Sequence, residues 1–266
     1  MSEGNRWYGD EGPIVDVAWL KARLGNLGVR VVDVRPASVY AAGHLAGALH
    51  ADLYQPHLKL RDSSPEERRR FHAALEAEFG RFGVRPGERV IFYEDVGGPV
   101  AAYGVWLLDY AGHGGGALLD GGLDAWLAAG GGLTRSHPTA DPSQVRLAPV
   151  ADLLATADDL RRAIDQTGGS LPTILDTRSD REYRAGTIPT ATHLEWVRTL
   201  TPEGRFRSPA EAEQLFRQAG VTPSKRVVTF CGSGYRAAHA YVALRALGNQ
   251  QVANYAPSWN EWGREP

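Results

Sequence analysis

An internal repeat limits the possible folds of this chain more than any other feature of its sequence. Residues 31–53 (VVDVRPASVYAAGHLAGALHADL) align without a gap with residues 174–196 (ILDTRSDREYRAGTIPTATHLEW). Identical residues in this alignment include Asp33 and Asp176, Arg35 and Arg178, Tyr40 and Tyr183, Gly43 and Gly186, Ala48 and Ala191, and His50 and His193. A repeat of this length predicts two copies of one domain.

The repeat continues toward the carboxyl end of each copy. Residues 79–93 match residues 216–230, and the segment around Trp126 (LDGGLDAWLAAG) resembles the segment around Trp262 (YAPSWNEWG). Between the copies, the sequence is rich in Gly, Pro, Thr and Ser and shows little periodicity, which is typical of a linker. We therefore expect a first domain at 10–130, a linker at 131–152 and a second domain at 153–266.

Short apolar segments alternate with helical segments in both copies. Strands are predicted at 29–34, 90–93, 117–119 and 227–230, and helices at 65–82 and 210–219. This alternation predicts an α/β fold with two tandem domains, each a mainly parallel sheet flanked by helices on both faces. Ligands of such sheets bind beyond the carboxyl ends of the strands.

The only cysteine of the chain, Cys231, directly follows one predicted strand. A helix is expected from Ala237 onward, so the cysteine precedes a helix amino terminus, where free N–H groups stabilise an anion. Together with Arg236, these groups are expected to lower the cysteine pKa from about 8.5 toward neutrality and make it a nucleophile. An inert buried cysteine is the alternative. The predicted anion-binding loop consists of Gly232, Ser233, Gly234, Tyr235 and Arg236.

The first copy lacks this chemistry. Its corresponding loop is EDVGGPV, with Glu94 in the place of the cysteine. Neither a thiol nor an arginine is present in it, and Glu94 and Asp95 would repel an anionic substrate. We therefore expect a non-catalytic first domain, which either helps to shape the cleft or is an inherited scaffold.

Together these motifs resemble the two-domain rhodanese family of sulfurtransferases over nearly the whole chain. The resemblance rests on the tandem Asp-x-Arg…Tyr-x-x-Gly-x-Ile-Pro pattern, the CGSG loop and the SWNEWG tail. It implies that a small anionic donor, thiosulfate or 3-mercaptopyruvate, passes a sulfane sulfur to cyanide or to a thiol acceptor such as thioredoxin. The sulfur would be carried as a persulfide on Cys231 and held by the loop N–H groups, without a cofactor.

The sequence does not determine which of the two sulfur donors is preferred. The CGSG segment resembles the mercaptopyruvate-using members, whereas Tyr235-Arg236 stands where both groups usually have Val-Thr. An arginine that the family tends to place before Tyr183 is replaced by Glu182, and an insertion with a second arginine is missing. Arg181, Arg184 and Arg236 are candidates to contact the donor in their place, because guanidinium binds carboxylate or sulfonate bidentately.

Several other polar residues occur in both copies, which favours a structural role. Asp176 and Arg178 could orient the Cys231 loop, but their equivalents in the first copy point to a structural ion pair. His50 and His193 are likewise expected to be structural. His239, on the helix after the loop, is expected at the surface or in helix packing. Trp196, Trp259 and Trp262 are candidates for the cleft wall or the core.

Composition gives no support for a nucleic-acid-binding, membrane, secreted or metal-binding protein. Lys plus Arg number 29 and Asp plus Glu number 31, giving a net charge of −2 that provides no argument for binding nucleic acid or an anionic membrane. No membrane-spanning or signal segment is evident, and a lone cysteine fits a reducing compartment, so a cytoplasmic location is expected. The scattered histidines and single cysteine give no metal site.

Two other functions fit an activated cysteine. A cysteine phosphatase or arsenate reductase on the same scaffold would have five residues between Cys and Arg, whereas four separate Cys231 from Arg236 here. The smaller ring suits a single sulfur. A persulfide carrier or redox sensor that does not turn over a small donor would need the same activated thiol, and turnover measurements would separate it from an enzyme.

Overall fold

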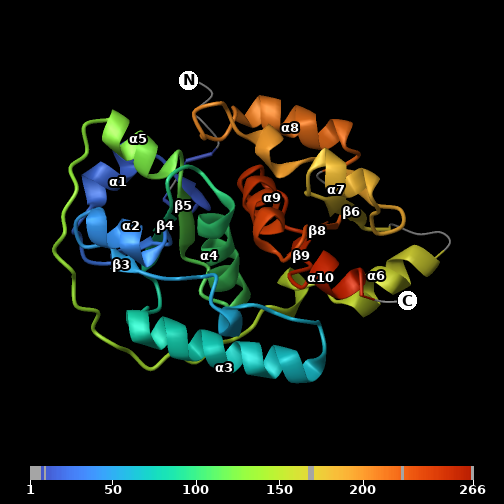
Figure 1. Cartoon of the computed structure of the whole chain (residues 1–266), viewed down its shortest axis with the longest axis horizontal. Helices are drawn as coiled ribbons and strands as arrows, with labels where there is room; N and C mark the ends of the chain where they lie inside the picture. The colour runs from blue at the N-terminus through green and yellow to red at the C-terminus, as the bar shows by residue number, and fades with distance from the viewer. Residues whose placement is uncertain (1–6, 9, 167–170, 223–224, 265–266) are drawn as a thin grey trace.

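The computed structural model describes residues 7–8, 10–166, 171–222 and 225–264. The first six residues, where no signal segment is expected, and the proline turn expected at Pro223 lie outside the described residues. The described chain forms two α/β domains, one at the left of Figure 1 and the other at the right. Both have parallel sheets with helices on both faces, as the alternating sequence pattern predicts.

The first domain contains a five-stranded sheet in the order β1-β5-β4-β2-β3, counted over the described residues. Its strands are β1 (Ile14–Val15), β2 (Val29–Asp33), β3 (Leu49–His50), β4 (Arg89–Tyr93) and β5 (Gly116–Leu119). Its helices are α1 (Val17–Arg23), α2 (Ala37–Ala42), the 3-10 helix η1 (Pro56–Leu58), α3 (Pro65–Phe82), α4 (Pro99–Tyr110) and α5 (Gly122–Ala128).

The second domain repeats this arrangement around a sheet of four strands in its described part, in the order β7-β6-β8-β9. Its strands are β6 (Thr173–Asp176), β7 (Thr192–His193), β8 (Val227–Phe230) and β9 (Val252–Asn254). Its helices are η2 (Ala151–Leu153), α6 (Ala157–Asp165), α7 (Asp180–Arg184), η3 (Trp196–Thr199), α8 (Pro209–Gln218), α9 (Tyr235–Ala246) and α10 (Trp259–Trp262). Where the first sheet has β1, a single bridge joins Leu154 to Asn254.

Helix boundaries follow from capping side chains. Ser64 caps α3 by accepting from the N–H of Glu67, and Gly83 ends the helix in a left-handed conformation with φ of 66°. In the second domain, Ser179 and Glu182 form a reciprocal capping box on α7. The predicted bounds of β8 and α3 match the structure, and those of α8 differ by one residue at each end.

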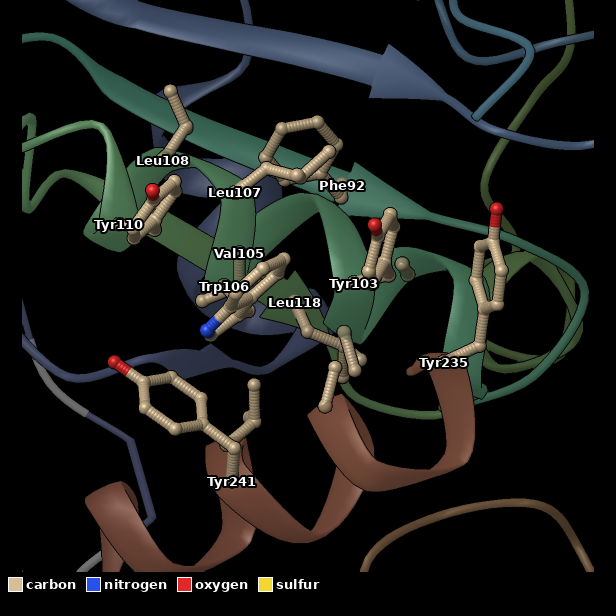
Figure 2. Close-up of a cluster of buried hydrophobic side chains, with 14 of the residues drawn as sticks. Phe92, Tyr103, Val105, Trp106, Leu107, Leu108, Tyr110, Leu118, Tyr235 and Tyr241 are labelled. Carbon is tan, nitrogen blue, oxygen red and sulfur yellow. The ribbon is translucent and has the colours of Figure 1, made fainter. Parts of the chain in front are cut away.

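The two domains share one hydrophobic core. Helices α4 and α9, which follow equivalent loops in the two copies, lie side by side at the centre of Figure 1 and pack against each other. Aromatic side chains from both helices fill the space between them (Figure 2). The Tyr241 hydroxyl donates to the Asp109 carboxylate at 2.8 Å, and the Trp106 indole donates to the Leu153 carbonyl at 3.0 Å. The relative position of the domains is therefore fixed by core packing.

The connecting segment after α5 runs along the first domain, as the yellow-green trace in Figure 1 shows. Backbone hydrogen bonds attach it at several points: Thr134 pairs with His44, Ser143 donates to the Gly80 carbonyl, and Val150 donates to the Tyr110 carbonyl. The segment has no helix or strand between Arg135 and Val150, as its low periodicity predicts, yet it is held against the domain along its length.

Candidate active site

The Cys231 loop lies at the carboxyl end of β8, directly before α9. The thiol is buried, with 1% of the residue exposed. The N–H groups of Ser233 and Gly234 point at its Sγ atom, at 3.4 and 3.1 Å. Gly234 has a φ of 92°, which turns the backbone so that these donors converge and α9 can begin at Tyr235. Two N–H donors and a helix amino terminus thus meet at one sulfur atom, an arrangement that stabilises a thiolate.

Ser258 supports the Cys231 loop through a hydrogen bond, and this residue was not identified from the sequence. Its Oγ accepts from the Cys231 N–H at 3.0 Å and donates to the Tyr255 carbonyl at 2.7 Å. This buried serine has a φ of 57°, a strained value for a residue other than glycine. The repeat aligns it with Gly122, whose φ is 55°, so the alignment around the two tryptophans carried a usable signal.

Arg236 forms a bidentate ion pair with Glu182, with N–O distances of 2.7 and 2.8 Å. Hydrogen bonds from Arg236 lower the pKa of the Glu182 carboxyl to about 2. The same contact, together with the nearby Cys231 thiol, raises the pKa of Arg236. The positive charge that Arg236 was expected to add beside Cys231 is therefore paired with the Glu182 carboxylate.

Asp176 and Arg178 form a buried ion pair, with the closest N–O distance at 2.7 Å. The first copy contains the same pair, Asp33 and Arg35, at 2.6 Å. Arg178 reaches the Cys231 loop only indirectly: its guanidinium lies 4.2 Å from the ring centroid of Trp259, and the backbone N–H of Trp259 donates to the Cys231 carbonyl. This geometry is that of a structural pair that supports the loop through the C-terminal tail.

Arg181 and Arg184 are exposed on α7. Arg184 lies 3.6 Å from Asp180 on the same helix, and the described residues include no hydrogen bond or ion pair between either arginine and the Cys231 loop. Their role as donor contacts stays a prediction.

The histidines occupy structural positions. His50 and His193 each place Nε2 2.8 Å from a backbone carbonyl, those of Arg35 and Arg178 respectively. His239 is fully buried, so the surface alternative is wrong and the packing alternative is right. Its Nε2 lies 3.0 Å from the Gly97 carbonyl of the other domain, and burial lowers its pKa to about 4.

The three tryptophans of the second copy, which were expected in the cleft wall or in the core, lie in different surroundings. The Trp196 ring packs edge-on against His239 at 5.1 Å, whereas Trp259 covers Arg178 beneath the Cys231 loop. Trp262 is partly buried against the core of the second domain.

Glu94 occupies the position of Cys231 in the first domain. The Leu123 N–H donates to the Glu94 carbonyl at 2.8 Å, just as the Trp259 N–H donates to the Cys231 carbonyl at 3.0 Å. The Glu94 carboxylate accepts from the N–H groups of Val100 and Ala101 at the start of α4. Burial raises its pKa to about 7. Its side chain thus fills the site that a bound anion would need.

The first domain also forms a wall beside the Cys231 loop, which the sequence did not reveal. The Tyr235 hydroxyl donates to the Leu53 carbonyl at 2.7 Å. The Tyr54 and Tyr103 rings lie 4.8 and 4.3 Å from the Tyr235 ring. Burial, Glu94, Asp52 and the Cys231 thiol raise the pKa of Tyr54. The first domain therefore packs directly against the Cys231 loop through Tyr235.

The described residues contain no cluster of three or more His, Cys, Asp or Glu side chains that could hold a metal ion. No helix among them is long and apolar enough to cross a membrane.

Comparison with known proteins identifies relatives that match both domains of the chain. The family model described as "Rhodanese-like domain" matches residues 16–129 and 156–265. The chain is 33% identical over 265 residues to a thiosulfate sulfurtransferase of Azotobacter vinelandii, covering 95% of this chain and 94% of that protein. It is 34% identical over 274 residues to a probable 3-mercaptopyruvate sulfurtransferase of Pseudomonas aeruginosa, covering 93% of each. Its fold matches the crystal structure of the Escherichia coli 3-mercaptopyruvate sulfotransferase SseA, with a TM-score of 0.75, 22% identity, and coverage of 93% and 99%.

Proposed function

Because the chain belongs to the rhodanese family and is a sulfurtransferase, we propose that Cys231 is the nucleophile that carries the transferred sulfur. The observation that supports this assignment best is the pair of N–H groups, from Ser233 and Gly234, directed at the Sγ atom. The first domain has a carboxylate at the equivalent position, so we assign catalysis to the second domain, 153–266, and a non-catalytic role to the first, 10–130, with 131–152 as linker.

The reaction proceeds in two steps. With thiosulfate, the Cys231 thiolate attacks the outer sulfur, the S–S bond of the donor breaks, and sulfite leaves with the electron pair. With 3-mercaptopyruvate, the C–S bond breaks, and the thiol proton passes to the methyl group of the pyruvate that leaves. In both cases the product is a Cys231 persulfide anion. Cyanide then takes the outer sulfur as thiocyanate, or a thiol takes it as a persulfide, and the thiolate returns.

The loop explains how the persulfide is held. Its N–H groups already converge on Sγ, and the outer sulfur extends from this point toward the amino terminus of α9 and the remaining loop donors. Gly232, Tyr235 and Arg236 complete this loop. A thiol protein such as thioredoxin is one acceptor of suitable chemistry, and the lone cysteine supports a reducing compartment such as the cytoplasm.

Intact-protein mass spectrometry tests the proposal. Wild-type protein and the Cys231→Ser variant are each exposed to thiosulfate and to 3-mercaptopyruvate. We expect one added sulfur in the wild type only, and its removal by cyanide. Loading without repeated turnover would indicate a carrier instead. Hydrolysis of a phosphate ester without any added sulfur would contradict the assignment and favour the phosphatase alternative.

A further inference from the structure

Lys59 of the first domain lies beside Tyr235, a residue of the reactive loop. It follows η1 and is partly buried. Its Nζ atom is 5.2 Å from the ring centroid of Tyr54 and 5.7 Å from that of Tyr235. Resting on the two rings, the ammonium group is oriented by cation–π attraction while its stem packs on the aromatic wall.

The rings of Tyr54, Tyr103 and Tyr235 form an aromatic wall that joins Lys59 to the Cys231 loop. Tyr235 is the first residue of α9, at the end of the Cys231 loop, and Figure 2 shows its ring beside that of Tyr103 on α4. Tyr54 packs on the same ring and is 52% exposed, so the wall opens to solvent at this point. A donor that reaches the Cys231 loop along the Tyr235 side therefore passes the ammonium group.

The cationic side chains near the loop in the second domain are already paired. Arg236 is engaged by Glu182, and Arg178 by Asp176. On the first domain, Arg61 and Arg70 both pair with Glu67 at 2.6 Å.

Lys59 differs from these arginines, because no carboxylate among the described residues forms an ion pair with it. The nearby Asp52 accepts from the Tyr54 N–H and the Gln55 side chain.

An uncompensated cation has a specific use at this position. The thiolate and the donor are both anions, so their approach is opposed by Coulomb repulsion. Resting on the proposed function, we propose that Lys59 binds the anionic oxygens of the sulfur donor, the sulfonate of thiosulfate or the carboxylate of 3-mercaptopyruvate. The non-catalytic domain thereby supplies a specificity-determining residue to the active site.

Kinetics with matched variants test the proposal. Lys59→Met removes the charge and keeps much of the stem, and Lys59→Arg restores a charge. Lys21→Met is the control, because Lys21 also lies over an aromatic ring of the first domain, 5.6 Å from Trp126. We expect Lys59→Met to raise the KM for the donor about tenfold with a smaller change in kcat, Lys59→Arg to recover part of the loss, and Lys21→Met to match the wild type. A rise for one donor only would support the proposal and assign the contact to that donor's anionic group.

Chemical labelling gives an independent measurement, since the chain has only three lysines, Lys21, Lys59 and Lys225. In the Cys231→Ser variant the donor binds without reacting. Thiosulfate or 3-mercaptopyruvate should then slow acetylation of Lys59 by acetic anhydride and leave that of Lys21 unchanged. An unchanged donor KM in Lys59→Met, with equal acetylation of Lys59 in both conditions, would overturn the proposal. Because persulfide formation by the wild type is measured separately, this result would leave the proposed function standing.

Discussion

The two glycines of the reactive loop should differ greatly in their response to the same substitution. Gly234 has a φ of 92°, and a Cβ atom added there would lie 2.7 Å from the Ala256 carbonyl oxygen. At Gly232 no left-handed φ is required, and an added Cβ would meet only the guanidinium end of the Arg236 side chain, at 3.2 Å. Gly234→Ala and Gly232→Ala therefore add the same methyl group two residues apart in very different surroundings.

The expected size of the effect follows from this geometry. A left-handed conformation costs an alanine about 1–2 kcal/mol, and the contact with a fixed backbone oxygen raises the total for Gly234→Ala to roughly 3 kcal/mol. Relief of the strain would rotate the Gly234 N–H away from Sγ. Loss of one preorganised donor to a reacting anion slows catalysis about 100-fold or more. For Gly232→Ala we expect less than about 1 kcal/mol.

Two measurements check this prediction. Urea denaturation gives the unfolding free energy of each variant, and quenched-flow mass spectrometry gives the rate at which donor adds sulfur to Cys231. We expect Gly234→Ala to be impaired in both and Gly232→Ala to form the persulfide at close to the wild-type rate. Equal losses in the two variants, or normal sulfur loading in Gly234→Ala, would refute the assigned role of the Gly234 backbone.

Two further predictions concern buried titratable groups, one in each copy. Burial raises the pKa of Glu94 from 4.5 to about 7. Ionisation of this group therefore lowers the free energy of unfolding as the pH rises through this range, by roughly 3 kcal/mol in total above pH 7. The amide oxygen of the Glu94→Gln variant can still accept from the N–H groups of α4. In urea denaturation this variant should be more stable than the wild type at pH 8 and about equally stable at pH 4. An equal effect at both pH values would contradict this prediction. The pKa of His239 is lowered from 6.5 to about 4, so the wild type should lose roughly 3 kcal/mol as the pH falls between these values. His239→Gln, which can still donate to the Gly97 carbonyl, should flatten that slope, and an unchanged slope would show that another group is responsible.

Much of the fold could be predicted because the chain contains two repeats of one domain sequence. The repeat of Asp33 and Arg35 at Asp176 and Arg178 predicted the two domains, and the strand before Cys231 has the predicted bounds. These features depend on local periodicity and residue type, which one sequence contains.

The parts that could not be predicted are contacts between distant segments. Nothing in the pattern around Lys59 or Leu53 indicates that they meet Tyr235, and the burial of His239 depends on the Gly97 carbonyl of the other copy. The neutralised charge of Arg236 likewise depends on how α7 packs beside α9. Ser258 is an intermediate case: it was not singled out from the sequence, although its alignment with Gly122 carries a signal of a special backbone conformation.

The packing of α4 on α9 also has a consequence for molecular symmetry. Equivalent elements meet in this contact, as they do across the twofold axis of a homodimer, so the chain has the architecture of a symmetric dimer joined by a linker. Such a dimer would have two equal sites, yet here they differ. Beside Glu94, the two domains are joined by hydrogen bonds: the Gly97 N–H donates to the Gly204 carbonyl, and the Phe206 N–H donates to Asp120. Two equivalent positions have thus diverged within one polypeptide, so that one holds a buried carboxylate and the other a thiol that faces N–H donors.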